Sequence, residues 1–216
     1  YFQKVHMTCQ IMKKVNIKNF DRKLINNINS MPERDSPFYL LDIKQLKQEL
    51  NTFKNAFEKN VHVCYSYKTN YLKPIIQTFD NLGVLSEIVS SFEADLTKEF
   101  GINPRKVIYN GPIKSSNSIK YILEGGGIVN ADSLDDLKNI CEIASVCRNK
   151  DSCKIGIRLS FNQKGLHSRF GIEYSSETHK KILSIISAFN IPKISCIHIH
   201  MPNRDLNSFI LRAEAI

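Results

Sequence analysis

The sequence lacks any long, uninterrupted apolar run. No stretch approaches the roughly 18 consecutive apolar residues that a membrane-spanning helix requires, and no charged segment followed by an apolar one marks a secretory leader. With 216 residues, of which 42% are hydrophobic, the chain is long enough to bury one sizeable core. We therefore expect a globular, soluble, cytoplasmic protein that has no membrane partner.

Closely spaced cysteine pairs are also missing. The chain has six cysteines, and none of them forms a Cys-x-x-Cys motif. They fall mostly in segments that we expect to be strands or helices, where a metal cluster or a disulfide framework is not indicated. We interpret them as reduced thiols in a cytosol.

Long clusters of basic residues are absent, although the net charge is +9 and the isoelectric point is about 9.2. A basic domain can carry a patch that tracks nucleic-acid phosphates. Here the lysines are scattered, and in helix-like segments such as 44–49 they alternate with acidic and polar residues. This pattern is typical of a solvated face, so we expect no nucleic-acid partner.

A repeated alternation of strand-like and helix-like segments organises the chain. A strand at 38–41 leads to Asp42, a plausible N-cap for a helix over 43–58. Each later strand is followed by a stretch with helical periodicity, which predicts parallel strands joined by right-handed crossovers. These later strands are expected near 61–67, 84–89, 106–110, 127–131, 154–159 and 193–200.

The two faces of the strands differ, and this difference decides between two parallel architectures. In 154–159, Ile155 and Ile157 share one face while Gly156 and Arg158 share the other; in 193–200 the two histidines lie opposite the isoleucines. A doubly wound sheet, covered by helices on both faces, would have apolar strands throughout. One polar and one apolar face instead predict an α/β fold of the (β/α)8 TIM barrel type.

The number of units is too small for a complete barrel. We count about six strand–helix units, where a complete barrel has eight and about 250 residues. We therefore expect residues 37–216 to be a partial barrel, completed by a further C-terminal segment. Residues 1–36 are interpreted as a tag remnant, Tyr1-Phe2-Gln3, followed by a polar lead-in.

Lys68 is the strongest candidate for chemistry. It closes the strand-like run 61–67 and precedes a helix-like stretch, which places it at the mouth of the expected sheet. Period-two alternation puts it on one face with His62, Cys64 and Ser66. An ammonium group held against such a wall loses hydration, which frees the amine to attack a carbonyl carbon and form a Schiff base. The alternative is a lysine at the edge of a strand that reaches solvent.

Other polar residues stand where strands are expected to end. Because the active sites of such barrels gather where the carboxyl ends of the strands converge, these side chains are expected to meet Lys68 at one rim. Singly, each is more often a structural polar group or a helix cap. They are Glu87, Asn110, Asp132, Arg158 and His200.

Several short motifs resemble those of one enzyme family, and they occur in the family's order. They are Tyr-Ser-Tyr-Lys-Thr-Asn at 65–70, Ser-Ser-Phe-Glu at 90–93, Asn-Gly-Pro-Ile-Lys at 110–114, Asp-Ser with Asp-Leu at 132–137, Ser-Arg-Phe-Gly at 168–171 and Ile-His-Ile-His at 197–200. The ordered set is similar to the barrel-type (fold type III) pyridoxal-phosphate-dependent decarboxylases, which include the diaminopimelate and ornithine decarboxylases.

The resemblance implies specific roles. Lys68 would be the catalytic lysine that holds pyridoxal 5′-phosphate as a Schiff base, and His200 would be catalytic and stack on the pyridine ring. Glu87 and Arg158 would bind the cofactor in the polar shell around that ring, and Arg169 would serve a subunit contact. The implied function is decarboxylation of a small-molecule substrate, an amino acid that is basic, diaminopimelate-like or conjugated, by a homodimer with shared active sites. A C-terminal β-domain, to which the lead-in could belong, is also implied.

The sequence departs from the family pattern at several positions, and alternative functions stay open. Pro202-Asn203 stands where the family usually has Gly-Ser, and the glycine-rich phosphate loop and the acid that pairs with the pyridinium have no counterpart here. A barrel-type racemase, a short barrel protein that merely carries pyridoxal phosphate, or a non-catalytic homologue that regulates a partner would share many of these features. A metal hydrolase could use His198-x-His200 as a zinc chelate, but we expect no metal.

Overall fold

The computed structural model describes residues 39–57, 60–160 and 168–200, together with residues 26, 30 and 210. The chain divides into two compact units, Tyr1–Phe57 and Glu58–Ile216.

The described part of the first unit is dominated by helix α2 (Ile43–Asn55). The Asp42 carboxylate caps this helix by accepting hydrogen bonds from the backbone N–H groups of Lys44 at 2.9 Å and Gln45 at 3.0 Å, so the predicted cap is confirmed. The helix ends three residues earlier than predicted. The strand predicted at 38–41 is wrong for residues 39–41, which have no strand structure and no strand beside them among the described residues. Phe38 lies outside the described residues.

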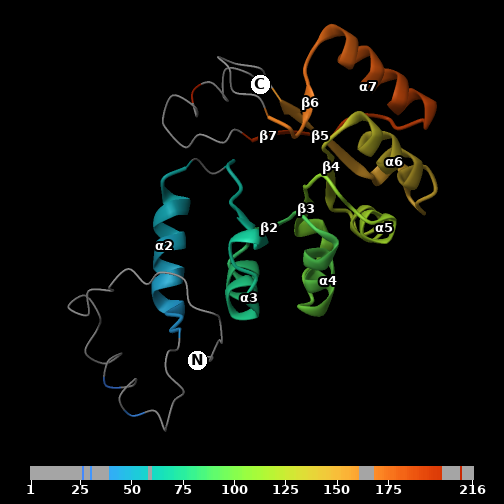
Figure 1. The fold of residues 1–216 in the computed structure, drawn as a ribbon. Coiled ribbons are helices and arrows are strands. Elements are labelled where there is room, and N and C mark those ends of the chain that lie inside the picture. Colours follow the sequence, from blue (N-terminus) through green and yellow to red (C-terminus); the bar gives the residue numbers. More distant parts are fainter. Residues whose placement is uncertain are drawn as a thin grey trace. The chain divides into compact units, whose positions relative to one another are not determined.

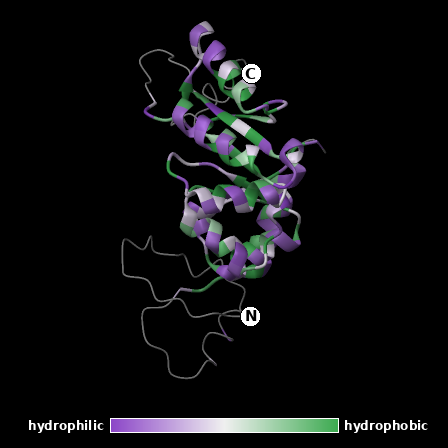
Figure 2. Cartoon of the chain, turned by 90° about the vertical axis from the view of Figure 1, so that its right-hand side faces the viewer, coloured by the Kyte–Doolittle hydropathy of each residue, from purple (hydrophilic) through white to green (hydrophobic). Residues whose placement is uncertain are grey.

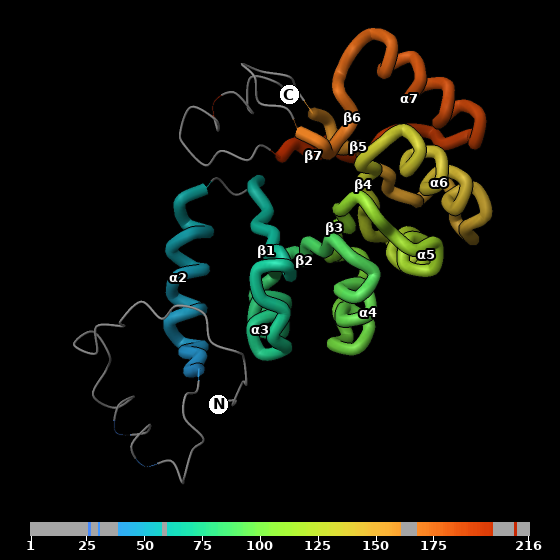
Figure 3. Tube along the Cα trace, in the orientation of Figure 1, coloured from blue at the N-terminus to red at the C-terminus, as the bar shows by residue number. Residues whose placement is uncertain are grey.

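The second unit alternates strands and helices, as Figures 1 and 3 show. All six strands predicted after residue 60 are present, each with bounds within three residues of the prediction. The elements are β1 (Cys64–Ser66), η2 (Tyr67–Thr69), α3 (Lys73–Asn81), β2 (Leu85–Ile88), α4 (Ser91–Glu99), η3 (Pro104–Lys106), β3 (Val107–Tyr109), α5 (Ser116–Glu124), β4 (Ile128–Ala131), α6 (Leu134–Ser145), η4 (Lys150–Ser152), β5 (Lys154–Ser160), β6 (Ile172–Glu173), α7 (Ser176–Ala188) and β7 (Cys196–Ile199).

The strands form one sheet in which every pair is parallel. The order is β1-β2-β3-β4-β5-β6, and β7 also pairs with β5. The two-residue strand β6 was not predicted, because two residues are too short to produce an alternation pattern. It pairs with Leu159 and Ser160 of β5, just past Ile157, where the pairing of β5 with β4 ends.

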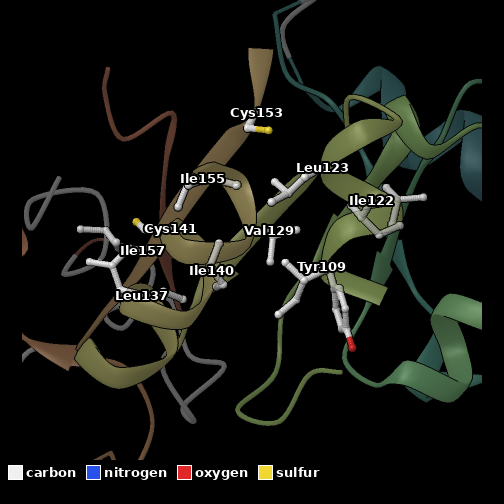
Figure 4. Close-up of a cluster of buried hydrophobic side chains, with 14 of the residues drawn as sticks. Tyr109, Ile122, Leu123, Val129, Leu137, Ile140, Cys141, Cys153, Ile155 and Ile157 are labelled. Atoms are coloured by element: carbon white, nitrogen blue, oxygen red, sulfur yellow. The ribbon is translucent and has the colours of Figure 1, made fainter. Parts of the chain in front are cut away.

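The hydrophobic core lies between the helices and one face of the sheet. Val129, Ile155 and Ile157 from the strands pack with residues of α5 and α6 such as Leu123 and Ile140, as Figure 4 shows. The helices carry both hydrophobic and hydrophilic residues (Figure 2), as expected for elements that cover a core on one side. Because the described helices of this unit pack against the apolar face of the sheet and a cavity lies against its polar face, the sheet is of the barrel type and not doubly wound.

Serine residues near the carboxyl ends of the strands begin four helices. Ser90 and Ser133 cap α4 and α6 by accepting hydrogen bonds from the backbone N–H groups three residues later. In both loops the acid at that third position reaches back: Glu93 accepts from the N–H of Val89 at 2.7 Å, and Asp136 accepts from the residue before Ser133. The Ser-x-x-Glu and Asp-Ser-x-x-Asp motifs are therefore helix starts that fix the loop conformation at the rim. Ser115 and Ser175 cap α5 and α7.

One expectation about the outer face is not met. Ile197 of β7, predicted to be buried under helices, is 50% exposed. Strand β7 lies at the edge of the described sheet, where β5 is the one described strand that pairs with it, and Ile197 also contributes to the lining of the cavity described below.

Candidate functional site

A cavity of about 1160 Å³ opens against the polar face of the sheet. Residues from the ends of β1, β2, β3, β4, β5 and β7 line it, so the predicted convergence of strand ends is present. The lining residues are Cys64, Ser66, Lys68, Glu87, Val89, Ile108, Asn110, Gly111, Pro112, Asn130, Arg158, Ser168, Arg169, Phe170, Cys196, Ile197, His198, Ile199 and His200.

Lys68 lies on η2, the single turn that follows β1, and not on the strand itself. Cys64 and Ser66 line the cavity with it, as the alternation predicted. Lys68 is exposed, so the protein wall does not by itself strip its ammonium group of water as we expected. Burial raises the pKa of the nearby Glu93, whereas the positive charge of Lys68 lowers it.

A chain of side-chain hydrogen bonds crosses the wall of the cavity from β2 to β4. The Asn110 Nδ2 group donates to Glu87 Oε1 at 3.0 Å, and Asn130 Nδ2 donates to Asn110 Oδ1 at 2.7 Å. Asn110 and Asn130 are both buried. Glu87, a predicted cofactor-binding residue, is therefore anchored at the cavity by an amide.

Arg158 is held by a carboxylate that follows the neighbouring strand. Its Nη1 group lies 2.8 Å from Asp132 Oδ1, and both side chains are almost buried. The guanidinium also lies over the Phe170 ring, 5.1 Å from its centroid, which is within the range of a cation–π contact. The Arg169 guanidinium lies 4.7 Å from the centroid of the same ring. These contacts place the Ser-Arg-Phe-Gly motif beside the cavity.

A second ion pair supports the loops that follow β3 and β4. Lys114, whose side chain is fully buried, donates to Asp136 Oδ2 at 2.5 Å and to the carbonyl oxygen of Gly111 at 2.6 Å. Asp136 Oδ2 also accepts from the Asp132 backbone N–H at 2.9 Å. Gly111 has φ +95°, and a Cβ there would collide with the carbonyl oxygen of Val89, so the turn requires glycine.

The two histidines of the β7 segment both line the cavity, but at different levels. His198 pairs in register with Arg158, deep in the sheet, whereas His200 follows the end of the strand and is exposed. Burial lowers the pKa of His198 to about 4, and the neighbouring charge of Arg158 adds to this effect, while Glu87 opposes it. His198 is therefore a neutral imidazole at neutral pH, and its Nδ1 atom has no hydrogen-bond partner among the described residues.

The sequence interpretation missed Asn130, which the same period-two rule would have placed on the cavity face with Asp132. The same rule places Cys64 beside Lys68 and Cys196 on the face of the two histidines, and both cysteines line the cavity. Burial raises the pKa of both thiols, and a hydrogen bond with the Asn130 amide partly opposes this for Cys196. The five described cysteines are free, so the prediction of reduced thiols agrees with the described part of the chain.

Within residues 39–57, 60–160 and 168–200, no three His, Cys, Asp or Glu side chains are grouped closely enough to hold a metal ion. Nor does the described chain contain a helix with the length and apolar character to cross a membrane. Pro202 and Asn203, at the departure from the family motif, lie outside the described residues.

Comparison with protein families gives a match over most of the chain. The model of the pyridoxal-dependent decarboxylase family's pyridoxal binding domain matches residues 43–214. The chain belongs to this family. The resemblance predicted from the sequence is thereby confirmed, as is pyridoxal 5′-phosphate as the cofactor of the family.

Individual relatives are distant. The chain is 29% identical over 182 residues to diaminopimelate decarboxylase of Helicobacter pylori strain J99, a match that covers 80% of this chain and 44% of that protein. It is 23% identical over 154 residues to antizyme inhibitor 2 of Xenopus laevis, covering 71% of this chain and 32% of that protein. The chain thus spans less than half the length of these curated relatives.

A solved structure supports the fold. The crystal structure of H. pylori diaminopimelate decarboxylase complexed with L-lysine has a TM-score of 0.72 to this chain at 22% sequence identity. The similarity covers 89% of this chain and 50% of that one. This confirms the predicted α/β architecture of the barrel type.

The cavity residues fit pyridoxal phosphate. Lys68 offers a primary amine at the mouth, and Arg158 supplies a fixed positive charge in the wall. Two further buried atoms, Ser66 Oγ and His198 Nδ1, have no hydrogen-bond partner among the described residues and belong to cavity-lining side chains. Unpaired buried polar atoms in a cavity of this size are suited to a polar ligand.

Proposed function

We propose that the protein decarboxylates an amino acid and that Lys68 holds pyridoxal phosphate as a Schiff base. The observation that carries this proposal is the placement of Lys68 at the mouth of a cavity whose wall bears Glu87, Arg158 and His200, within the region that matches the pyridoxal binding domain. When bound, pyridoxal phosphate withdraws electrons from the substrate carbon that loses carbon dioxide.

The side chains of the protein would bind and orient the cofactor and the substrate and shield them from water. Lys68 is exposed at the cavity mouth, so its amine would be accessible to the aldehyde of the cofactor and could carry a proton to or from the substrate. His200 follows β7 at the same rim and would contact the ring of the cofactor. Arg158 and Glu87 would fix the polar surroundings, because each is already held by a hydrogen-bonded partner from the adjacent strand.

The substrate class is proposed to be a basic, diaminopimelate-like or conjugated amino acid. Support comes from the relatives, which include diaminopimelate and ornithine decarboxylases, and from a solved relative complexed with L-lysine. We further propose a cytoplasmic homodimer with shared active sites, in which Arg169 at the cavity edge contacts the second subunit. We do not expect the protein to bind nucleic acid.

A second candidate is a homologue that keeps the fold and regulates another protein. The observation that favours it is the relative named antizyme inhibitor 2, which is not named as a decarboxylase. A barrel-type racemase is a third possibility within the same chemistry. Measurement of carbon dioxide release and of stereochemical inversion separates all three.

The decisive experiment is covalent trapping of the cofactor. The purified protein incubated with pyridoxal phosphate should show a visible absorbance band, and borohydride reduction should attach the pyridoxyl group to Lys68. Peptide mapping identifies the modified lysine, and Lys68→Ala with Lys73→Ala as the matched control tests the assignment. Recovery of the group on another lysine would refute the role of Lys68.

A further inference from the structure

The hydrogen-bonded chain Glu87–Asn110–Asn130 has features that packing alone does not explain. Glu87 lies on β2, Asn110 directly follows β3 and Asn130 lies on β4, and all three residues line the same cavity. Asn110 is 7% exposed and Asn130 is 2% exposed, so both amides are removed from water. Buried amides are costly unless their hydrogen bonds are made.

The carboxylate dictates the orientation of both amides. An ionised Glu87 can only accept hydrogen bonds, so Asn110 must present its Nδ2 group to Glu87 Oε1. Asn110 Oδ1 is then left facing Asn130, which must in turn present its own Nδ2 group. The two distances, 3.0 Å and 2.7 Å, are those of well-formed hydrogen bonds.

At the Asn130 end of the hydrogen-bonded series, the arrangement leaves one buried oxygen atom unpaired. Asn130 Oδ1 has no hydrogen-bond partner among the described residues. Its space exists because position 156 is glycine, since a Cβ there would overlap Asn130 Oδ1. An apolar side chain at position 130 would avoid the unpaired acceptor, so core packing does not account for the amide.

We propose that Asn110 and Asn130 are positioning residues that hold the Glu87 carboxylate in one orientation at the cofactor cavity. This inference deepens the proposed function and rests on it for the role of Glu87. Asn130 acts on Glu87 through Asn110, and it fixes the Asn110 amide so that its donor cannot rotate away. A carboxylate held in this way is in place before the cofactor enters, and no reorganisation is needed on binding.

The test is a double-mutant cycle. The variants are Asn130→Leu, Glu87→Met and the combination of the two, with Ser118→Ala as a control that removes a buried hydroxyl on α5 away from the cavity. The first readout is the dissociation constant for pyridoxal phosphate, measured by absorbance titration. Asn130→Leu should weaken binding about fivefold in the native background and less than about twofold in the Glu87→Met background.

The second readout does not require the cofactor. Urea midpoints of the apo protein are measured for Asn110→Leu and Glu87→Met, singly and combined, and the two changes should be non-additive. Asn130→Ala is carried in parallel, so that a Leu variant that fails to fold does not stop the test.

The outcomes separate this inference from the proposed function. Equal loss of affinity on Asn130→Leu in both backgrounds would show that Asn130 acts through packing and would overturn the inference. Additive urea midpoints would overturn it as well, whether or not the cofactor binds. If the unmutated protein binds no pyridoxal phosphate, the proposed function fails, and the urea cycle alone then decides whether the Asn110 amide holds Glu87.

Discussion

Acid should destabilise the protein through His198. Burial, with the nearby Arg158 charge, lowers the pKa of this imidazole to about 4, while Glu87 and Asp132 act in the opposite direction and His200 in the same one. In the unfolded chain a histidine binds its proton near pH 6.5. Between these two values the unfolded state takes up a proton that the folded state does not, so stability is lost as the pH falls from about 6.5 towards 4.

The magnitude follows from the two pKa values. The free energy of unfolding should decrease, relative to neutral pH, by about 2 kcal/mol at pH 5 and about 3 kcal/mol at pH 4 through this residue alone. Other groups titrate in the same range. Burial is the main cause of the raised pKa of Glu93, so the contribution of Glu93 to the free energy of unfolding increases as the pH falls, opposite to that of His198. The difference between the native protein and a His198→Leu variant isolates the contribution of His198.

The assay is urea unfolding at a series of pH values. We expect the native curve to fall relative to that of His198→Leu between pH 6.5 and 4, while His179→Gln, a change at an exposed position of α7, should follow the native curve. Parallel curves for the native protein and His198→Leu across this range would show that His198 is not buried as a neutral group, and the reasoning would be refuted.

Three further predictions concern other parts of the site. His200→Ala should keep the native melting temperature but release pyridoxal phosphate during gel filtration, whereas retention equal to that of the native protein would argue against contact with the cofactor. Lys114→Met leaves Asp136 with no cation in a buried site and should cost about 3–5 kcal/mol in urea unfolding; adding Asp136→Leu should restore much of it, and no recovery would contradict the pairing. Gly156→Ala should lower stability by about 1–3 kcal/mol, because its Cβ would clash with Asn130; an unchanged melting temperature would show that the wall relaxes freely.

The barrel-type fold was predictable because its signals are local and repeated. Period-two alternation in 154–159 and 193–200 placed Arg158, His198 and His200 on one face, and the structure puts all three at the cavity. The strand at 38–41 was predicted from composition alone, and composition cannot supply the neighbouring strand that a β-strand needs. Strand β6 shows the converse, since two residues carry no pattern but can still pair with a longer strand.

The sequence predicted which residues lie near the site, but not which of them contact one another. Glu87, Asn110, Asp132 and Arg158 were expected at one rim; Glu87, Asn110 and Arg158 line the cavity, and Asp132 is paired with Arg158 behind it. Which of them pair could not be read from the sequence, because pairing depends on strand register: Arg158 meets Asp132, and Glu87 meets Asn110. The surroundings of Lys68 were also misjudged, since a strand pattern cannot show that the chain turns into η2 and leaves the side chain exposed.

The parallel ladder has a consequence for the order in which the molecule folds. Each strand from β1 to β5 pairs with the next strand along the chain, so the contacts that join them are short in sequence and can form one after another as the chain leaves the ribosome. Strand β7 is different, because it must wait for β6 and α7 before it reaches β5. The wall that carries Lys68 and Glu87 would thus be assembled early, and the histidines would join it later. A nascent chain would lack the His198 and His200 side of its cavity until β7 has paired with β5, which ties that part of the cavity to a late pairing step.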